Sequence, residues 1–270
     1  MNRQAYSKSV RIYFFTQRWV GRALRVANGC FVGLWLGVLT GERLYAIVEE
    51  YFTRSKSGEF GEFNYHSKEW NRRGLSDWER RAVTNYFGGC KRLLVLGAGG
   101  GREVLALQRL RYQVDGFESH PDLVIAANEL LREDGLDSTV HPIAPNEAPD
   151  IETTYDGIIV GWGMYTSVQG RNRRIALLRR LRARTRVRCP ILVSFLYRDS
   201  TARSYKMGVY IANTIRRVLR REPAEVGDWL APLYVHYFTQ DEIISELAEG
   251  RFDTVHYDTN AYGHAVGKAT

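Results

Sequence analysis

The chain has 270 residues, 44% of them hydrophobic, and a formal net charge of +8. This length is enough to bury a full core, as one large α/β domain or as a domain with an appendage. Its three cysteines are odd in number and lack metal-ligand spacing, which argues against a disulfide framework and a zinc site. They predict a reducing, cytoplasmic setting. The positive charge favours an anionic partner or surface without identifying one.

The N-terminal region is basic and partly apolar. Its first 41 residues contain six basic side chains and no acidic one. Residues 29–40 are apolar or small, but this stretch is well short of the roughly 20 residues that span a bilayer. We expect residues 1–75, helical as far as about residue 53, to form a cap on a larger domain. Two alternatives stay open: a peripheral membrane helix within residues 1–40 and a cleaved targeting peptide.

A polar segment and a helix start lead into the larger domain. The polar residues 58–74 are predicted to form a loop. Ser76 can then cap a helix, and Glu79 stands where a capping box needs its carboxylate. We expect this helix to run from Asp77 to Tyr86. Beyond it, strands and helices alternate, which predicts a doubly wound, mostly parallel sheet in residues 76–270.

The most informative stretch runs from Arg92 to Glu118. It predicts an apolar strand, a turn with four glycines, a helix, and a second strand that ends at Glu118. This order indicates a nucleotide-binding βαβ unit, because glycines let the backbone approach a ligand and a carboxylate can hold ribose hydroxyls. A dinucleotide fingerprint, G-x-G-x-x-G, needs glycine where Arg102 stands. The spacing that fits is G-x-G-x-G, on Gly97, Gly99 and Gly101.

This G-x-G-x-G loop resembles motif I of the class I S-adenosylmethionine (SAM)-dependent methyltransferases. The resemblance continues through residues 155–165, similar to the family's fourth strand, and residues 189–195, similar to its fifth. Residues 236–257 resemble its F-T-x-x-E helix and sixth strand, and residues 262–269 its antiparallel seventh. The resemblance implies a seven-stranded, mostly parallel sheet with SAM as cofactor, and Glu118 as the acid that binds the ribose.

Two positions depart from the family pattern. Val95 stands where many members carry an acid that orients the methionine end of SAM, so Glu103 or the N-terminal segment would take over. The contact with the adenine ring would be made by Asn146 or by the backbone. The cofactor-binding residues that the resemblance implies are Gly97, Ala98, Gly99, Gly100, Gly101, Glu103, Glu118, Ser119, Asn146, Gly161, Trp162 and Gly163.

The end of the expected fourth strand is the candidate reaction site. Gly161 and Gly163 leave room for a methyl group, while Trp162 and Tyr165 could wall the site, and the Tyr165 hydroxyl could orient a nucleophile. Ordinary aromatic packing is the alternative for both rings. On the family pattern His236 lies near the mouth of the sheet, where it would act as a general base or as a structural histidine.

Three further regions bear on the acceptor. Residues 199–233 are longer than a connection needs, so they could cover the substrate. Residues 171–188 contain nine arginines and no carboxylate, which predicts either a solvated helix face or an RNA or acidic-lipid surface. His66, Arg72 and Arg73 precede the domain, in a region that folds over SAM in this family.

The resemblance implies a SAM-dependent methyltransferase with a small-molecule acceptor that is methylated on oxygen or nitrogen. The alternatives are an RNA methyltransferase and a non-catalytic SAM-binding, membrane-associated module. The remaining histidines show no shared ligand spacing, so no metal site is expected: His120, His141, His256 and His264. The oligomeric state stays open.

Overall fold

The computed structural model describes residues 20, 23–24, 26–55, 64–137, 139–150, 152–199, 203–230 and 232–270. Their contacts divide the chain into two compact units. One comprises residues up to 40 together with residues 200–230, and the other comprises residues 41–199 and 231–270. The expected division at residue 75 stays a prediction, since these units are divided elsewhere along the chain. Most of the basic segment before residue 26 lies outside the described residues.

The smaller unit contains a helix over residues 26–38, helix α9 (Arg203–Val218) and the short strand β6 (Asp228–Leu230). The two helices approach closely, because a Cβ on Gly33 would lie 2.4 Å from the carbonyl oxygen of Gly208. Arg216 donates to the Leu36 carbonyl (2.7 Å) and Arg221 to the Val38 carbonyl (2.6 Å). These guanidinium groups satisfy carbonyls that the helix end leaves without intrahelical donors.

Among the described residues, no single helix is both long enough and apolar enough to cross a bilayer. The helix of residues 26–38 and helix α2 (Gly41–Ser55) reach that length and composition only as a pair, with a break between them.

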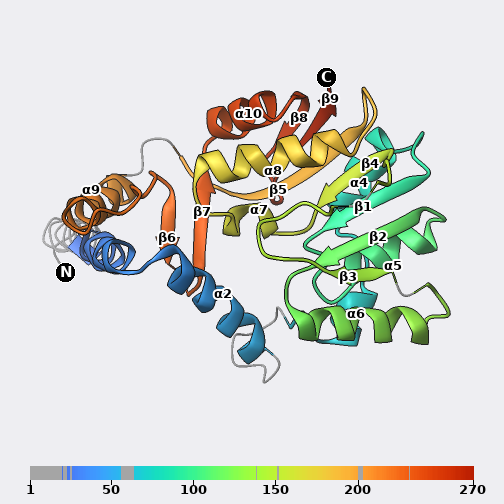
Figure 1. Ribbon diagram of the computed structural model, residues 1–270, viewed down its shortest axis with the longest axis horizontal. Coiled ribbons are helices and arrows are strands. Elements are labelled where there is room, and N and C mark those ends of the chain that lie inside the picture. Colours follow the sequence, from blue (N-terminus) through green and yellow to red (C-terminus); the bar gives the residue numbers. More distant parts are fainter. Residues whose placement is uncertain are drawn as a thin grey trace, which may run out of the picture. The chain divides into compact units, whose positions relative to one another are not determined.

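The larger unit is built on a sheet whose strand order is β3-β2-β1-β4-β5-β9-β8 (Figure 1). Each of these strands runs parallel to its neighbours except β9, which is antiparallel to both β5 and β8. The mostly parallel sheet with an inserted antiparallel last strand is therefore confirmed. The strands are β1 (Arg92–Leu96), β2 (Gln113–Glu118), β3 (Val140–Pro142), β4 (Gly157–Val160), β5 (Pro190–Tyr197), β8 (Phe252–Asp258) and β9 (Gly263–Ala269).

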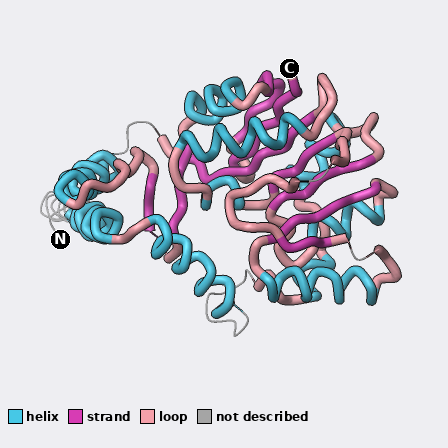
Figure 2. Tube along the Cα trace, viewed as in Figure 1, coloured by secondary structure: helices cyan, strands magenta, loops and turns pink. Residues whose placement is uncertain are grey.

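Helices cover both faces of this sheet (Figure 2). One face packs against α4 (Asp77–Tyr86), α5 (Arg102–Arg109) and α6 (Pro121–Glu133) through residues such as Val83, Leu105 and Leu130. The other packs against α8 (Arg171–Ala183) and α10 (Gln240–Glu249) through Leu178 and Leu247. Apolar cores on both faces explain why the central strands read as continuous apolar runs.

Several local expectations change in the structure. The strand expected at residues 155–165 is shorter in the structure, where β4 covers Gly157–Val160. Residues 164–167 form a short helix instead, α7 (Met164–Ser167). An additional strand, β7 (Tyr234–Phe238), pairs in parallel with the last two residues of β5. The described part of the expected loop at residues 58–74 includes a short helix, α3 (Lys68–Arg72), which begins after the cap Ser67. The expected cover at residues 199–233 contains α9 and β6.

The helix start at Ser76 is confirmed, and its capping box has a second function. Glu79 accepts the Ser76 backbone N–H at 2.6 Å and also binds the buried guanidinium of Arg102 at 2.6 and 2.7 Å. Arg102 reaches Glu103 (2.6 Å) and the Gly74 carbonyl (2.9 Å) as well. Its side chain therefore points toward the start of α4, where its partners Glu79 and the Gly74 carbonyl lie.

The arginine-rich helix α8 is bound to α10 and to the C-terminal residue. Arg174 is fully buried and pairs with Glu246 at 2.7 Å, whereas Arg171 pairs with Glu249 at 2.6 Å near the surface. Arg179 and Arg182 donate to the backbone carbonyls of Glu249 and Thr270. The expectation of a simple solvated arginine face is therefore wrong at Arg174.

Candidate functional site

A cavity of about 430 Å³ lies at the carboxyl ends of β1, β2 and β4, within the larger unit. Its volume falls in the range of small-molecule sites, and apolar and aromatic side chains dominate its lining. The walls come from α2, the loop before α3, the glycine loop, the turns after β2 and β3, the start of α7, and the β8–β9 turn. The lining includes Tyr45, Val48, Glu49, Phe52, Tyr65, Gly97, Gly99, Phe117, Glu118, Ser119, His120, Ile143, Pro145, Asn146, Trp162, Gly163, Met164, Leu233 and Tyr262.

The glycine loop joins β1 to α5 in a conformation that needs its glycines. Gly101 is the N-cap of α5 with φ +92°, and a Cβ there would lie 3.0 Å from the Ala127 side chain. Gly161, at the end of β4, lies so near the loop that a Cβ would be 2.1 Å from the Gly97 carbonyl oxygen. Both glycines bring backbone segments together around the cavity, although neither lines it.

Glu118 links the end of β2 to the glycine loop. Its carboxylate accepts the backbone N–H of Gly99 at 2.7 Å and that of His120 at 2.9 Å. The side chain is nearly buried but lines the cavity. A carboxylate held by two amides keeps a fixed direction, and the same oxygens can accept further hydrogen bonds from a ligand.

The expected cofactor-binding residues fall into three groups. Seven line the main cavity: Gly97, Gly99, Glu118, Ser119, Asn146, Trp162 and Gly163. Ala98, Gly100 and Glu103 line a smaller adjoining pocket, in which Tyr65 and Asn71 also take part. Gly101 and Gly161 line neither pocket and act through the backbone packing described above.

Glu103 lies in a buried charge network beside the loop. It pairs with Arg102 at 2.6 Å and accepts the Trp162 backbone N–H at 3.4 Å. Burial raises the pKa of Glu103, an effect that the charge of Arg102 opposes. Burial works against the charge of Arg102, but Glu103 and Glu79 outweigh it and raise the pKa of the guanidinium. The network therefore places the Arg102 guanidinium between two buried carboxyl groups next to the glycine loop.

Neither of the two expected catalytic residues, Tyr165 and His236, is among the residues that line the cavity, and both catalytic roles stay predictions. Tyr165 is 1% exposed, and its hydroxyl donates to the buried Glu246 carboxylate at 2.6 Å. Burial, followed by the charge of Glu246, raises the Tyr165 pKa well above its usual value. His236 lies in β7, is 1% exposed, and packs edge-on against Phe238. The burial of both side chains supports the packing alternative left open above.

An aromatic group shields one side of the cavity. The Trp162 ring lies 6.4 Å from Trp70 in a stacked arrangement and 5.3 Å from Tyr262 in an edge arrangement. Tyr65 and Tyr262 also line the cavity, and burial raises the pKa of both phenols. Trp162 thus forms a wall, as expected, and the two phenols stay neutral near pH 7.

His120 is a cavity-lining residue that the sequence reasoning did not select. It is 7% exposed, its Nε2 lies 3.1 Å from the Thr53 hydroxyl, and its Nδ1 has no hydrogen-bond partner among the described residues. The sequence signal that could have identified His120 is its position two residues after Glu118, the last residue of β2. Of the side chains expected to fold over the cofactor, His66 contacts the Phe52 carbonyl and Arg72 pairs with α6, and neither lines the cavity.

No protein-family profile and no curated protein matches the sequence. Solved structures do match. A Methanosarcina mazei protein described as a SAM-dependent methyltransferase is 17% identical, with a TM-score of 0.57 over 73% of this chain and 98% of that one. The SAM-bound amino pentose methyltransferase CalS10 from Micromonospora echinaspora is 14% identical and has a TM-score of 0.53. That match covers 78% of this chain and 99% of CalS10. The CcbJ methyltransferase from Streptomyces caelestis is 14% identical and has a TM-score of 0.54, and the match covers 73% of this chain and 91% of that one.

The chain has the class I SAM-dependent methyltransferase fold. At this level of identity, the likeness establishes the fold. In this methyltransferase fold the strand order reverses between β1 and β4, since β2 lies on one side of β1 and β4 on the other. Open α/β sheets bind ligands at the carboxyl ends of strands beside such a reversal. The cavity, the glycine loop and Glu118 all lie at this place.

Proposed function

We propose that the protein is a SAM-dependent methyltransferase. The observation that carries the proposal is the convergence of Gly97, Gly99 and Glu118 on one cavity at the strand-order reversal. The solved methyltransferases with this fold, two of which are described as bound to SAM, support the same cofactor.

The residues of the site fit a nucleoside cofactor with a charged amino-acid tail. The Glu118 carboxylate would hold the ribose hydroxyls, and Ser119 and Asn146, which also line the cavity, would contact the adenine end. Backbone N–H groups at the start of α5 suit the methionine carboxylate, because a helix N-terminus favours anions. SAM, when bound, supplies an activated methyl group on a sulfonium centre.

The contribution of the chain to methyl transfer would then be alignment and exclusion of water. Gly163 leaves space at the end of β4, since an added Cβ there would meet only the Tyr262 hydroxyl at 3.7 Å. Trp162 and Tyr262 form the wall beside this space. An acceptor held here would be positioned without bulk water, which is the main requirement of an in-line displacement. Where the acceptor must lose a proton, we propose His120 or Glu49 as the base.

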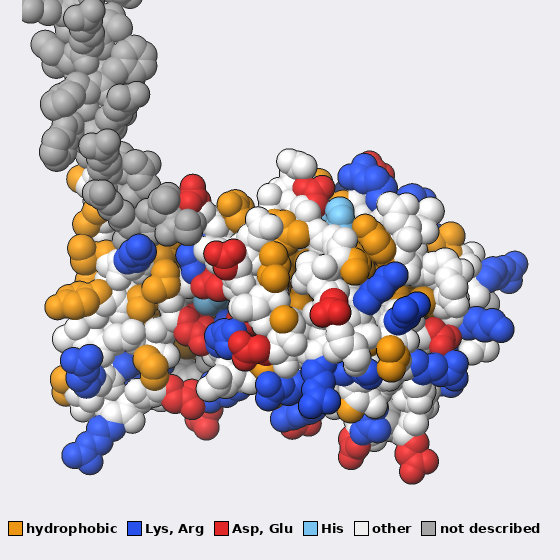
Figure 3. All heavy atoms as spheres, turned by 90° about the horizontal axis from the view of Figure 1, so that it is seen from above, with side chains coloured by type: hydrophobic (Ala, Val, Ile, Leu, Met, Phe, Trp, Pro, Cys, Tyr) orange, Lys and Arg blue, Asp and Glu red, His pale blue; other side chains and the backbone are white. Residues whose placement is uncertain are grey.

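A small molecule is the acceptor that we favour. The cavity is walled by side chains of α2 and by the aromatic group, and its lining is largely apolar. Four arginines of α8 bind α10 or the C-terminal residue, which supports a structural role for them over contact with RNA. On the face shown in Figure 3, basic and acidic side chains are interspersed. One neighbour of the fold is described as an amino pentose methyltransferase and another as a glycopeptide N-methyltransferase, which supports an acceptor other than RNA and, for the second, a nitrogen nucleophile.

Calorimetric titration with SAM, S-adenosylhomocysteine and NAD tests the proposal. We expect micromolar-range binding of SAM or S-adenosylhomocysteine and none of NAD, followed by conversion of bound SAM when candidate acceptors are supplied. Binding of NAD without SAM would overturn the cofactor assignment. Stable SAM binding without turnover on any acceptor would favour the non-catalytic alternative. The cytoplasmic setting and membrane contact through residues 1–40 stay predictions.

A further inference from the structure

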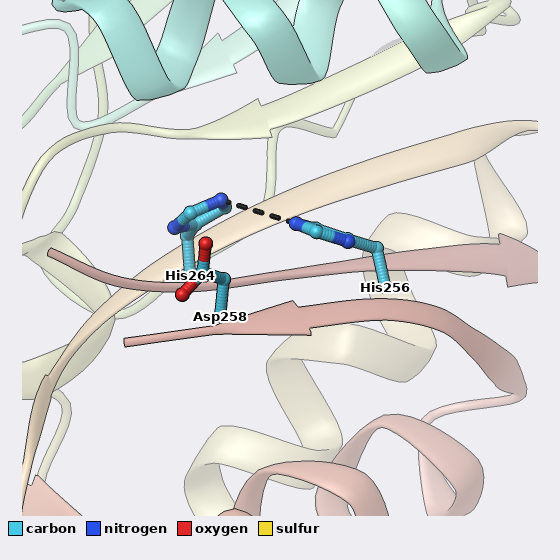
Figure 4. Close-up of side chains that lie close together, drawn as sticks. All are labelled: His256, Asp258 and His264. Atoms are coloured by element: carbon cyan, nitrogen blue, oxygen red, sulfur yellow. Dashed lines mark hydrogen bonds between the residues drawn. The ribbon is translucent and has the colours of Figure 1, made fainter. Parts of the chain in front are cut away.

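Three potential metal ligands lie on one face of the β8–β9 ladder. In its register Asp258 is opposite His264, and His256 is opposite Val266. Because side chains alternate between faces along a strand, His256, Asp258 and His264 share a face. Figure 4 shows the two imidazole rings directed toward one another, with the Asp258 carboxylate beside His264. The eight-residue separation of the histidines matches no common ligand spacing, so only the ladder brings them together.

The distances within this cluster suit a small coordination sphere. The Nε2 atoms of His256 and His264 are 3.3 Å apart, and the possible ligand atoms of all three residues lie within 4.8 Å of one another. Zinc–nitrogen bonds of about 2.0–2.1 Å give a tetrahedral N···N edge of roughly 3.3–3.4 Å. The histidine pair therefore already has the separation of two zinc ligands. The carboxylate would need to approach by about 1.5 Å at most to complete the set.

Neighbouring groups orient the ligands. The His264 Nδ1–H donates to the Tyr262 carbonyl at 2.8 Å, so in the neutral ring the Nε2 lone pair is directed at His256. The Asn260 backbone N–H donates to the Asp258 carboxylate at 2.8 Å. The Trp78 ring lies 4.8 Å from His264. Hydrogen bonds of this kind to the far side of a ligand are typical of protein metal sites.

We propose that His256, Asp258 and His264 bind one divalent transition-metal ion of the zinc type. Two imidazoles and one carboxylate favour such an ion over Mg²⁺ or Ca²⁺, which prefer all-oxygen ligands. Three protein ligands leave a fourth position for water. The competing explanation for the short Nε2···Nε2 distance is a hydrogen bond in which one ring donates to the other, and this explanation predicts no metal binding.

The bound ion would connect the two strands beside the turn that carries Tyr262. None of its three ligands lines the cofactor cavity, whereas the Tyr262 ring does. Since the Tyr262 carbonyl also holds His264, the ion would fix this turn and so the aromatic wall. Its role is therefore positional and does not depend on the methyltransferase proposal.

Metal binding by the full-length, chelator-treated protein tests the site. We expect one equivalent of Zn²⁺ to bind in calorimetry, an equivalent of Co²⁺ to give the visible absorption of a tetrahedral centre, and Zn²⁺ to raise the melting temperature. His256→Gln and Asp258→Asn should each weaken Zn²⁺ binding at least tenfold. The matched control is His141→Gln, because His141 is exposed and outside the cluster.

The choice of variants separates loss of a ligand from loss of fold. His256 and Asp258 are only partly buried, so the replacements should keep the circular dichroism and melting temperature of the metal-free protein. The proposal is overturned if the wild type binds no Zn²⁺ at micromolar concentrations. It is equally overturned if both variants, correctly folded, bind Zn²⁺ as tightly as wild type. Mg²⁺ should give no heat in the same titration, and tight Mg²⁺ binding would contradict the ligand assignment.

Discussion

Neutralising Glu118 tests the cofactor site most directly. Its carboxylate accepts two backbone N–H groups, from Gly99 and His120, and lines the cavity. Glu118→Gln keeps the shape but removes the charge and leaves one acceptor oxygen. Hydrogen bonds to a charged group contribute about 1.5–3 kcal/mol. If ligand hydroxyls bind this carboxylate, the SAM dissociation constant should rise by about 10- to 150-fold, since 1.4 kcal/mol corresponds to tenfold.

Isothermal titration with SAM and S-adenosylhomocysteine measures this effect, and the melting temperature monitors the fold. Glu129→Gln is the matched control, because Glu129 is exposed on α6 and makes the same change of charge away from the cavity. The control should bind SAM like the wild type. An unchanged dissociation constant for Glu118→Gln, with a cooperative thermal transition, would refute the ribose role and leave Glu118 as a support of the loop alone.

Four other variants separate structural from functional roles. Gly161→Ala should destabilise the protein by about 1–3 kcal/mol or more, because the added Cβ would lie 2.1 Å from a carbonyl oxygen of the glycine loop. At Gly163 the added Cβ has space, so Gly163→Ala should cost only the roughly 1–2 kcal/mol that a left-handed backbone costs a residue other than glycine. Tyr165→Phe removes a hydrogen bond to a buried carboxylate, so we expect a loss of about 1.5–3 kcal/mol in denaturant unfolding and unchanged turnover per folded molecule. Arg179→Glu with Arg182→Glu should leave turnover on a small acceptor nearly unchanged.

Each of these expectations has a contrary outcome. A Gly161→Ala variant as stable as the wild type would mean that the close approach of β4 to the loop is misplaced. A tenfold fall in turnover for Tyr165→Phe, without loss of stability, would restore its proposed role at the nucleophile. RNA binding that falls steeply with salt and disappears in the double arginine variant would favour an RNA acceptor.

Local sequence signals predicted much of the fold. The capping box at Ser76, the glycine loop after β1 and the carboxylate that ends β2 each depend on a few neighbouring residues. The order of the elements supplied the rest, because right-handed crossovers leave few topologies for alternating strands and helices. The antiparallel last strand followed from the family resemblance and not from local pattern.

Contacts between distant residues could not be predicted from the sequence. Tyr165 follows β4, but the partner of its hydroxyl, Glu246, lies 81 residues away in the sequence. The partner of Arg102 was also not evident from the sequence, because Glu79 belongs to a different helix. Strand β7 was missed because Tyr234–Phe238 also fits the approach to the F-T-x-x-E helix. The wall that α2 contributes to the cavity has no motif at all.

The glycine loop is held from both ends by side chains outside it. Glu118 binds the Gly99 amide near one end, and at the other Arg102 reaches Glu79 and the Gly74 carbonyl. A loop fixed before the ligand arrives loses less conformational entropy on binding, so more of the contact energy contributes to affinity. Residues that hold the loop should therefore change stability and SAM affinity together. Residues that only line the cavity should change affinity alone, and this difference assigns each residue to the scaffold or to the site.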